Sequence, residues 1–599
     1  MRKTTIQTLL AIMMVTMTAA CQKDDATETN SQISYIGDSN AAGGGSGSSA
    51  ISVGSGDLTS FTVAIDSTTA EPTAAASAIY PSEEDSVSVS TFTNEVHIVF
   101  NGNTATCSAQ SGVTSSISGA HVTVDHGSTK NVCYVVSGNS TAGSLTVVGE
   151  KKYALKLNGV SIANSDSSAI NLLSKKRAYI ELCNGTTNTI KDGTTTQAED
   201  HKAAFYAKGK MLFSGDGLLR VYGNYNNGLG CADYIVFNSG NNIYAKSTAN
   251  NAIKANDGIY VNGGIINVEA TAVAGKGINC ESNIVINGGR TTAITTGNGT
   301  YDSDEQDTKA AAGVACDSVF TMNGGELYVR STGSGGKGIK ADWEAYINGG
   351  TIHAITEGSQ YRYSSSLTSS PKGIKVGTKN THGILNITDG TIMVRTSGSN
   401  GEGIESKGTL SISGGTVQIS AYDDAINSAG DLTISGGSVV AVGKNSDGLD
   451  SNGNMYIKGG NIVAYGASGA ESGIDVNENK QLYISGGAFF SIGGRIDASA
   501  GSSSQGIITT SGSTTANSTV TISSGNTTLA TFTMPPYAYS NGTIMATAAG
   551  MTSGSSYTLA LGSTTQTVTA ASSASSGMGG AGMQNGGMGG GPMSGGRPM

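Results

Sequence analysis

The sequence predicts an all-β fold: a right-handed parallel β-helix of about twelve coils, with an N-terminal β cap and a C-terminal antiparallel β module. An internal repeat is the first support. An apolar residue, often behind a glycine, recurs along the chain with a basal period of roughly 22 to 25 residues, as at Ile404, Ile426, Leu449 and Ile474. The full set of these anchor residues is Ile170, Phe205, Leu229, Ile253, Ile278, Val314, Ile339, Ile374, Ile404, Ile426, Leu449 and Ile474.

Glycine register and strand periodicity are the other two supports. A glycine follows many anchors at one constant offset; these glycines are Gly264, Gly289, Gly325, Gly350, Gly415, Gly437 and Gly460. Apolar residues alternate before and after such a glycine, as in Tyr456-Ile457 and Ile462-Val463-Ala464, which is the period of a β-strand. Three short strands per repeat leave no room for crossover helices. Each repeat is therefore expected to form one coil, stacked ~4.8 Å above the last.

The start of the chain predicts export and a lipid anchor. Residues 1–21 combine a basic start, an apolar run and small residues before Cys21, as in a lipoprotein signal peptide. Thr18-Ala19-Ala20-Cys21 resembles a bacterial lipobox, and Gln22-Lys23-Asp24-Asp25 resembles an acidic surface-export tag. We expect a lipoprotein on the cell surface, held in the outer membrane of a Gram-negative bacterium by acylated Cys21. Simple cleavage or a chance cysteine are the alternatives.

Five further segments follow the signal peptide. They are a flexible spacer (22–56), the N-terminal β cap (57–150), the parallel β-helix (151–495), the C-terminal β module (496–571) and a disordered Gly/Met tail (572–599). Val122-Thr123-Val124 and Val132-Cys133-Tyr134 are the strands expected in the cap.

The charge of the chain restricts its partners. A net charge of −10 and a pI near 5.2 argue against nucleic acid, because phosphate binding requires a basic surface. Cations and glycans remain. We expect a monomer that contacts the membrane only through its lipid.

An inward column of small residues is expected two positions after the anchors. It contains Cys231, Cys280 and Cys316, together with alanine, serine and valine in other coils. Buried free thiols are one interpretation. A disulfide between Cys280 and Cys316 is the other, since stacked coils bring them close and export permits one.

Two outward columns change from basic to acidic at one coil boundary. The lysines before it are Lys337, Lys340, Lys372 and Lys375, and the acids after it are Glu402, Glu405, Asp423, Asp424, Asp447, Asp450 and Asp475. Like charges ~5 Å apart repel by about 1 kcal/mol even in water. The acids are therefore candidate ligands of Ca²⁺, which takes several carboxylate oxygens. A solvated charged face is the alternative, and Lys372–Glu402 and Lys375–Glu405 could pair across the boundary.

Three insertions are expected on one edge beside these columns. Residues 191–202, 297–309 and 356–371 all enter just before an anchor. The third contains Tyr361-Arg362-Tyr363, whose aromatic faces could stack on sugar rings beside the lysine row. A groove for an acidic polysaccharide is the resulting prediction, with these three residues and the four lysines as its ligand-binding residues.

A family resemblance agrees with this interpretation. Residues 153–162 (Tyr-Ala-Leu-Lys-Leu-Asn-Gly-Val-Ser-Ile), Lys175-Lys176-Arg177, 184–190 (Asn-Gly-Thr-Thr-Asn-Thr-Ile) and 213–217 (Phe-Ser-Gly-Asp-Gly) resemble the carbohydrate-binding β-helix family. The family is typified by a clostridial cell-surface protein that binds cellulose and polygalacturonate. The resemblance covers about residues 92–568 and implies a pectate-lyase-like fold, bound Ca²⁺ and a binding role.

Three functions are weighed. The first is a surface-anchored, Ca²⁺-assisted lipoprotein that binds polygalacturonate-like or other plant cell-wall glycans. The second is a polysaccharide lyase, for which Lys337, Lys340, Lys372 and Lys375 are the available bases, although no complete lyase site can be assigned. The third is a structural adhesin. Binding without catalysis is the interpretation we favour.

Overall fold

The computed structural model describes residues 51–53, 61–65, 71–72, 78–108, 110–195, 201–379, 383–498 and 500–573. Cys21 with its signal peptide, most of the predicted spacer and nearly all of the Gly/Met tail lie outside these residues. Strands dominate the described part, and its helical elements are the 3-10 turns η1 (Glu83–Ser86) and η2 (Val89–Thr91). No helix within it is long and apolar enough to cross a bilayer.

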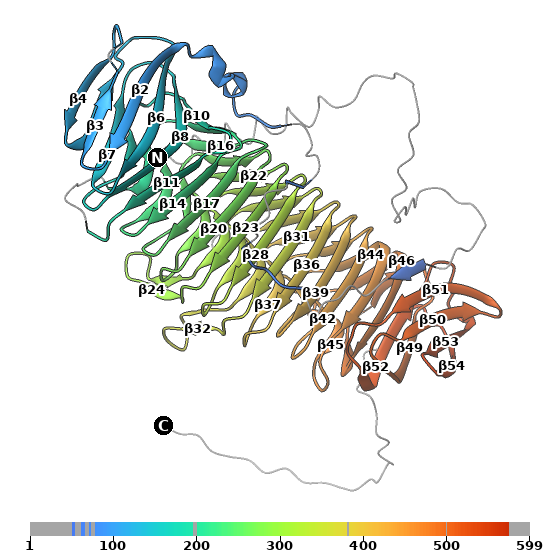
Figure 1. The fold of residues 1–599 in the computed structure, drawn as a ribbon. Helices are drawn as coiled ribbons and strands as arrows, with labels where there is room; N and C mark the ends of the chain where they lie inside the picture. Colours follow the sequence, from blue (N-terminus) through green and yellow to red (C-terminus); the bar gives the residue numbers. More distant parts are fainter. Residues whose placement is uncertain are drawn as a thin grey trace, which may run out of the picture. The chain divides into compact units, whose positions relative to one another are not determined.

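The predicted parallel β-helix is confirmed, with about fifteen turns (Figure 1). One strand of each turn joins a sixteen-stranded sheet, named here the anchor sheet, in which only the first pair is antiparallel. Its strands are, in order, β4 (Thr114–Ser118), β5 (Ala120–Asp125), β7 (Gly143–Val148), β9 (Ile170–Leu172), β12 (Ala203–Ala207), β15 (Asn227–Cys231), β18 (Ile253–Ala255), β21 (Lys276–Cys280), β26 (Ala312–Cys316), β29 (Lys337–Ala341), β34 (Lys372–Val376), β37 (Glu402–Ser406), β40 (Ile426–Ser428), β43 (Leu449–Ser451), β45 (Ser472–Val476) and β47 (Arg495–Asp497).

The remaining coil strands form two more parallel series, one before and one after the glycine turn. The first series is β10 (Ala178–Leu182), β13 (Met211–Gly215), β16 (Tyr234–Phe237), β19 (Gly258–Val261), β22 (Asn283–Ile286), β27 (Val319–Met322), β30 (Glu344–Ile347), β35 (Ile384–Ile387), β38 (Thr409–Ile412) and β41 (Leu432–Ile434). The second is β11 (Thr187–Asp192), β14 (Leu218–Gly223), β17 (Asn242–Ser247), β20 (Ile265–Ala270), β23 (Arg290–Thr295), β28 (Glu326–Ser331), β31 (Thr351–Thr356), β36 (Thr391–Thr396), β39 (Thr416–Ala421) and β42 (Ser438–Gly443). Four long strands run through both series: β6 (Val132–Ser140), β8 (Tyr153–Asn164), β44 (Met455–Tyr465) and β46 (Leu482–Gly493).

Stacking of equivalent residues is also confirmed. Ile339 pairs with Ile374, Ile374 with Ile404, and the series continues through Ile426 to Leu449. These side chains are at most 1 % exposed and belong to one continuous core. Because every coil buries its anchor on the coil before it, hydrophobic burial keeps all coils in the same register.

The coil count differs from the prediction because the helix begins two coils earlier in the chain and continues for one strand, β47, beyond β45. Val122 pairs with Leu145, and Leu145 pairs with Ile170, so the anchor column extends two coils upstream of its first predicted member. Their spacing along the chain matches the repeat, but no glycine directly precedes either residue. Part of the predicted cap therefore consists of ordinary coils. Its outer strands β2 (Asn94–Asn101) and β3 (Thr104–Cys107) form an antiparallel hairpin.

The glycine at a constant offset after the anchor has a steric cause. Gly415 has φ +77°, a left-handed conformation that other residues adopt at a cost. A Cβ atom there would also lie 2.7 Å from the carbonyl oxygen of Gly390 in the preceding coil. The coils thus approach so closely at this turn that only glycine fits.

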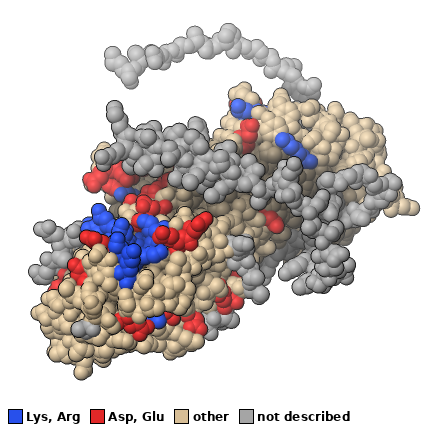
Figure 2. All heavy atoms as spheres, turned by 90° about the horizontal axis from the view of Figure 1, so that it is seen from above, with Lys and Arg blue, Asp and Glu red and all other residues tan. Residues whose placement is uncertain are grey.

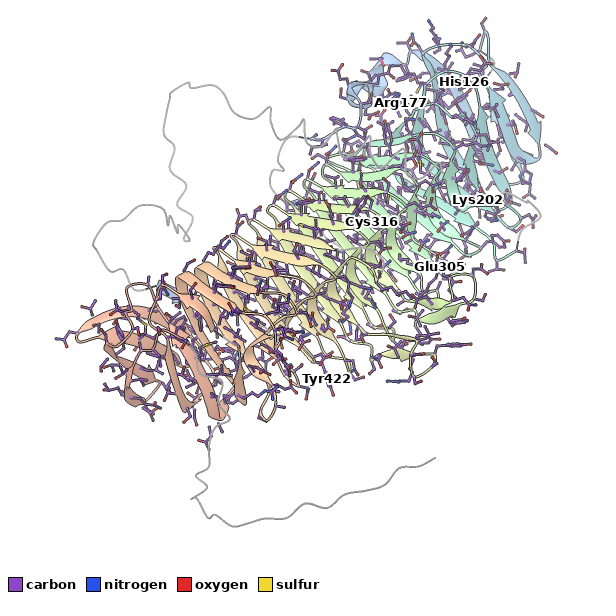
Figure 3. All side chains as sticks on the ribbon, turned by 180° about the vertical axis from the view of Figure 1, so that it is seen from behind. His126, Arg177, Lys202, Glu305, Cys316 and Tyr422 are labelled. Carbon is purple, nitrogen blue, oxygen red and sulfur yellow. The ribbon has the colours of Figure 1, made fainter. Side chains whose placement is uncertain are left out.

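The inward column of small residues follows the predicted order. Cys231 pairs with Ala255, Ala255 with Cys280, and Cys280 with Cys316. The Cys280 and Cys316 thiols are free and buried, and Figure 3 places Cys316 within the coils. Burial raises the pKa of Cys280 to about 12, so these thiols act as small apolar groups.

The last coil is covered by an antiparallel β module, as predicted. Its strands are β49 (Ile508–Thr514), β50 (Thr519–Ser524), β51 (Thr527–Thr533), β52 (Tyr539–Thr547), β53 (Ser556–Leu561) and β54 (Thr564–Thr569). β48 (Ala500–Ser503), which precedes them, pairs parallel with β46. β52 pairs antiparallel with β46, and a second core that includes Phe490 and Phe532 lies between module and coils. β1 (Ile51–Val53), which falls in the predicted spacer, is a strand that pairs with β51.

Candidate functional site

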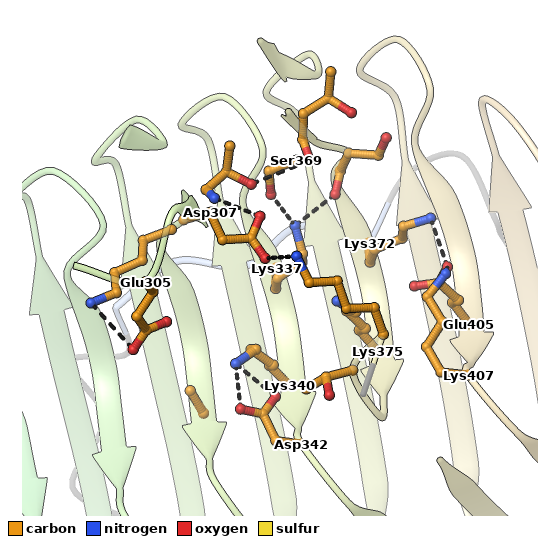
Figure 4. A pocket seen from close by; sticks show the side chains of 18 of the residues that line it. Glu305, Asp307, Lys337, Lys340, Asp342, Ser369, Lys372, Lys375, Glu405 and Lys407 are labelled. Carbon is orange, nitrogen blue, oxygen red and sulfur yellow. Dashed lines mark hydrogen bonds and ion pairs between the residues drawn. The ribbon is translucent and has the colours of Figure 1, made fainter. Parts of the chain in front are cut away.

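A groove of about 720 Å³ lies on the outer face of the anchor sheet, from β21 to β37. Eight lysines line it, and we name it the lysine groove (Figure 4). They are Lys276, Lys309, Lys337, Lys340, Lys372, Lys375, Lys379 and Lys407. The acidic side chains of the lining are Glu305, Asp307, Asp317, Asp342 and Glu405. Figure 2, which views the molecule from above, shows a cluster of Lys and Arg side chains bordered by acidic ones, with further basic side chains apart from it.

The strand register brings the four predicted lysines together. Lys337 pairs with Lys372 and Lys340 with Lys375 on the neighbouring strands β29 and β34. Lys276 occupies the same outward column two coils earlier, since it pairs with Ala312 and Ala312 with Lys337. The sequence therefore placed the lysine row correctly along the axis of the coils.

Two hairpins from the second and third insertions form one wall of the groove. They are β24 (Thr300–Asp302) with β25 (Asp307–Lys309), and β32 (Tyr361–Arg362) with β33 (Thr368–Ser369). The Tyr301 and Tyr363 rings stack with centroids 4.0 Å apart and planes 5° apart. The Thr308 hydroxyl also donates to the Thr368 carbonyl at 3.2 Å. The insertions thus support each other rather than projecting separately.

The packing of the two hairpins gives the three residues Tyr361, Arg362 and Tyr363 different environments. Tyr361 is half-buried against Gly299, where a Cβ atom would lie 2.7 Å from the tyrosine ring. Tyr363 is 56 % exposed, and Tyr301 stacks against one face of its ring. Arg362 is exposed and donates to Gln360 at 2.9 Å. Of the three, Tyr363 is the one that keeps an aromatic surface for a ligand.

Lys337 fastens the second hairpin to the coils. Its Nζ donates to the Gly335 carbonyl at 2.5 Å, the Ser370 carbonyl at 2.7 Å and the Ser369 hydroxyl at 2.8 Å. Burial, with Lys375 and Lys372 nearby, holds the pKa of Lys337 well below its usual value. This side chain is buried and occupied, so its role is to position the wall.

Lys372 compensates the first two acids beyond the boundary. Its ammonium group contacts Glu402 and lies 3.4 Å from Glu405, which also pairs with Lys407. Burial raises the pKa of Glu402 to about 7 despite Lys372. For Glu405 the two lysines outweigh burial and lower its pKa to about 2. The predicted Lys372–Glu402 pair forms, whereas Glu405 pairs with Lys372 and Lys407 instead of Lys375.

Two amines are left without a protein partner in the groove. Lys340 pairs with Asp342 at 2.7 Å, Lys379 with Asp307 at 2.7 Å, and Lys309 with Asp302. Neither Lys276 nor Lys375 forms an ion pair or side-chain hydrogen bond with any residue that the structure describes. Burial and neighbouring lysines lower the pKa of Lys276 to about 8, and they also lower that of Lys375. These uncompensated amines are available for an anionic ligand.

The predicted acidic ligands have several different environments. Asp424 accepts from the Asp447 backbone N–H at 3.0 Å, and Asp447 accepts from the Ser472 N–H at 2.5 Å. Both aspartates therefore cap the next coil. Asp450 pairs in register with Asp475. Burial and neighbouring aspartates raise the pKa of both Asp447 and Asp450 to about 8, and burial and Asp497 raise that of Asp475 to about 6.

Asp423, the remaining predicted ligand, is half-buried, and burial together with Asp424 raises its pKa. Across the described ranges, no three His, Cys, Asp or Glu side chains converge as a metal-binding group. The donors along this column are hard oxygens of the type that Ca²⁺ takes, but they are spread over coils rather than gathered.

The residues that sequence reasoning left out belong mainly to the wall. Asp307 and Lys309 lie on the second insertion and Lys379 lies in the turn between β34 and β35, and these residues follow no period. Lys276 could have been found, because it occupies the same column as Lys337. The single tryptophan, Trp343, is exposed and directly follows Asp342 of the groove.

Comparison with known proteins identifies the family of this chain. A protein-family model described as carbohydrate-binding domain-containing protein matches residues 118–275, 271–359 and 332–443. The chain belongs to this family. The resemblance noted in the sequence is thereby confirmed.

Two individual similarities accompany the family match. A carbohydrate-binding domain-containing protein of Acetivibrio thermocellus is 32 % identical over 120 residues, or 19 % of this chain. The match spans 42 % of that relative's length. A solved structure of a polysaccharide lyase-like protein from C. thermocellum, a gadolinium derivative, shares 20 % identity with a TM-score of 0.28. It covers 53 % of this chain and 96 % of that one. The fold described above rests on the strand pairing of this chain.

Proposed function

We propose that this protein binds an acidic, polygalacturonate-like polysaccharide along the lysine groove. The observation that carries the proposal is the pair of uncompensated amines, Lys276 and Lys375, in a groove whose other charged groups are largely paired with each other. A bound carboxylate would supply the missing countercharge. Membership of the carbohydrate-binding domain family supports a glycan as the source of that carboxylate.

The shape of the groove favours a polymer. Lys340 and Lys375 lie on adjacent coils, ~4.8 Å apart along the axis, and Lys276 lies two coils before Lys340. A chain with a carboxylate on each sugar could contact several of these amines in succession. Tyr363, at the tip of the wall, offers an exposed ring for stacking on a sugar face.

A divalent cation, Ca²⁺ in particular, is the second part of the proposal. Asp447 and Asp450 lie on one coil beyond the groove and Asp475 on the next. Burial and neighbouring carboxylates raise the pKa values of all three. A cation would relieve this repulsion, and uronate carboxylates of the glycan could complete its coordination. Side-chain rotation would be needed to gather the ligands. Added CaCl₂ should raise the melting temperature of the wild type more than that of Asp450→Asn.

A surface lipoprotein anchored at Cys21 is the setting we propose, with the polysaccharide met outside the cell. The sequence of residues 1–25 supports it. Metabolic labelling with an alkyne fatty acid tests it: the wild type should be labelled and Cys21→Ser should not. If neither the wild type nor Cys21→Ser is labelled, the proposed lipid anchor is wrong.

Glycan binding is tested by titrating the protein with polygalacturonate, cellulose and a neutral pectic glycan. Trp343 gives a fluorescence signal beside the groove, and calorimetry checks it independently. The wild type should bind polygalacturonate with an affinity that falls as salt rises. Lys276→Gln/Lys375→Gln should weaken binding about thirtyfold, since two charge contacts of roughly 1 kcal/mol each sum to about 2 kcal/mol.

A matched control is Lys246→Gln. Lys246 lies on β17, away from the groove, and pairs with Glu269 of β20. It should bind as the wild type does. Equal affinity for neutral and acidic glycans, with no effect of the double variant, would contradict the proposal. Retention by none of the glycans would favour a structural adhesin.

Lyase activity is kept as a second candidate on one observation. Lys375 is an amine without an ion-pair partner among the described residues, and its lowered pKa increases the fraction of free base at neutral pH. Absorbance of unsaturated uronate products during incubation with polygalacturonate and Ca²⁺ would reveal it. No such absorbance, together with retained binding, would assign the groove to recognition alone.

A further inference from the structure

Short described pieces of the chain before the first coil contact the β-helix at intervals along its length. We name residues 51–92 the strap; its described parts are 51–53, 61–65, 71–72 and 78–92. β1, at its start, pairs parallel with β51 of the C-terminal module, with Ser52 opposite Thr531. Its end leads directly into β2 in the first coils. Figure 1 shows its dark-blue pieces distributed from the C-terminal to the N-terminal coils.

The middle of the strap contacts central coils. The Phe61 ring lies 5.2 Å from the His353 ring of β31, centroid to centroid. The Arg395 guanidinium of β36 lies 5.4 Å from the Phe61 centroid, which is within cation–π range. Val63 is 3 % exposed. A buried apolar residue and a capped aromatic ring are typical of a packed segment rather than of a loose linker.

Glu71 is bound to turns of earlier coils. Its two carboxylate oxygens accept from the Gly264 N–H at 2.5 Å, the Ser239 hydroxyl at 2.8 Å and the Gly240 N–H at 2.9 Å. Two of these donors are backbone groups of stacked glycine turns. One carboxylate therefore closes the turns of two consecutive coils.

The end of the strap is bound to the first coils. The backbone of Ile79 exchanges two hydrogen bonds with the Asn262 amide, at 2.8 and 3.0 Å, and Tyr80 donates to Asn238 at 3.0 Å. Buried Asp85 accepts from Arg177 at 2.7 Å and from Tyr234 at 2.8 Å. Figure 3 shows Arg177 at this end of the coils.

These contacts follow one direction. As the residue number rises from 52 to 85, the partners move from β51 through β36 and β31 to the turns before β20 and β17, and then to β16 and β10. The strap runs opposite to the order of the coils. We propose that the strap sets the point of attachment of the β-helix. The chain that precedes residue 51 joins the fold at the C-terminal module, so a tether in that preceding chain would attach the β-helix by its C-terminal end.

The physical consequence is an orientation that the order of the sequence alone does not suggest. A linker joined directly to the first coil would hold the rod by its N-terminal end, whereas the strap shifts the attachment by about fifteen coils, or roughly 70 Å. The β2–β3 end would then point away from the tether. β1 also covers the β51 edge, which removes a free strand edge from the module.

Cross-linking between engineered cysteines tests the path of the strap. Ser52→Cys/Thr531→Cys and Ser52→Cys/Thr104→Cys are prepared in the full chain, with Cys21, Cys107 and Cys183 changed to Ser to remove competing thiols. A short bismaleimide is added, and the products are mapped by peptide mass. We expect a link between positions 52 and 531 within one monomer, and less than a tenth of that yield between 52 and 104.

Three results would overturn the inference. They are a link to position 104, a link to neither position, and a 52–531 link that appears only in dimers, which would mean strand exchange between copies. A further variant, Phe61→Ala/Glu71→Ala, removes the central contacts and should slow the 52–531 reaction several-fold if the strap acts as one unit. An unchanged rate would show that it does not. None of these results depends on what the lysine groove binds.

Discussion

Lys372 is the position where the charge reversal can be tested most directly. Its side chain is 8 % exposed, and those of Glu402 and Glu405 are 12 % and 5 % exposed. Lys372→Met keeps the length and apolar character of the side chain but leaves two buried carboxylates with less countercharge. Removal of one partner from a buried ion pair costs about 3–5 kcal/mol, because the remaining charge is neither hydrated nor paired.

This cost can be converted into a melting temperature. Unfolding entropy is about 2.1 cal/mol/K per residue, so for roughly 500 residues that unfold together 1 kcal/mol corresponds to about 1 °C. Lys372→Met should therefore melt about 3–5 °C below the wild type at pH 8 in calorimetry. Lys340→Met is the matched control. Its pair with Asp342 is more open, with side chains 29 % and 21 % exposed, and should contribute about 1 kcal/mol or less.

The loss of stability in Lys372→Met should depend on pH, and the pKa of Glu402 sets the direction of that dependence. The pKa of Glu402 is raised to about 7 from its ordinary 4.5, so its stabilising contribution is complete below pH 4.5 and is lost as the pH rises through 7. Without Lys372 this pKa rises further. The deficit of Lys372→Met should hence be smaller at pH 5, where Glu402 is protonated and only Glu405 is ionised, than at pH 8, where both carboxylates are charged. Equal losses for Lys372→Met and Lys340→Met, or a loss that does not change between pH 5 and 8, would refute the reasoning.

Three other predictions follow from the same structure. Polygalacturonate affinity should decrease as the pH rises through about 8, where Lys276 loses its charge, and calorimetry at pH 7 and 9 checks this; Lys276→Arg should reduce the change, and the remainder is assigned to Lys375, whose pKa is also lowered. Asp450→Asn should raise the melting temperature in EDTA at pH 8 by about 1–2 °C, since roughly 1–2 kcal/mol of repulsion is relieved, and have little effect at pH 5; the same gain at both would contradict the raised pKa. Gly415→Ala should cost about 1–3 kcal/mol, whereas Gly102→Ala, also left-handed but with open space around its Cβ, should cost less.

The sequence was sufficient for the register of the coils. Ile339, Ile374 and Ile404 repeat because each must be buried on the previous coil, and this requirement is local and periodic, so it is visible in the spacing. The same register placed Lys337 beside Lys372 and Asp450 beside Asp475 without further information. It missed Val122 and Leu145, which follow His121 and Ser144 instead of the glycine or alanine that precedes every predicted anchor.

Side-chain pairing was decided by the tertiary structure. Lys375 and Lys372 are both lysines on one strand, yet Lys372 is neutralised by Glu402 and Glu405, whereas Lys375 has no such partner among the described residues. The difference depends on rotamers and on competition from Lys407, which register does not specify. The stack of Tyr301 on Tyr363 likewise joins two insertions that have no repeat to align them.

The strap is a segment whose position could not be predicted from the repeat. Residues 51–92 carry no repeat, and a composition rich in serine, threonine and alanine is typical of a linker. Phe61 and Glu71 are bound by partners far away in the sequence, Arg395 and Gly264, whose distance along the chain leaves no periodic trace. The sequence by itself thus determined how each coil lies on the next, because the same burial recurs once in every coil. Only the folded chain decided which charges are left unpaired and by which end the rod is held, because those contacts each occur once.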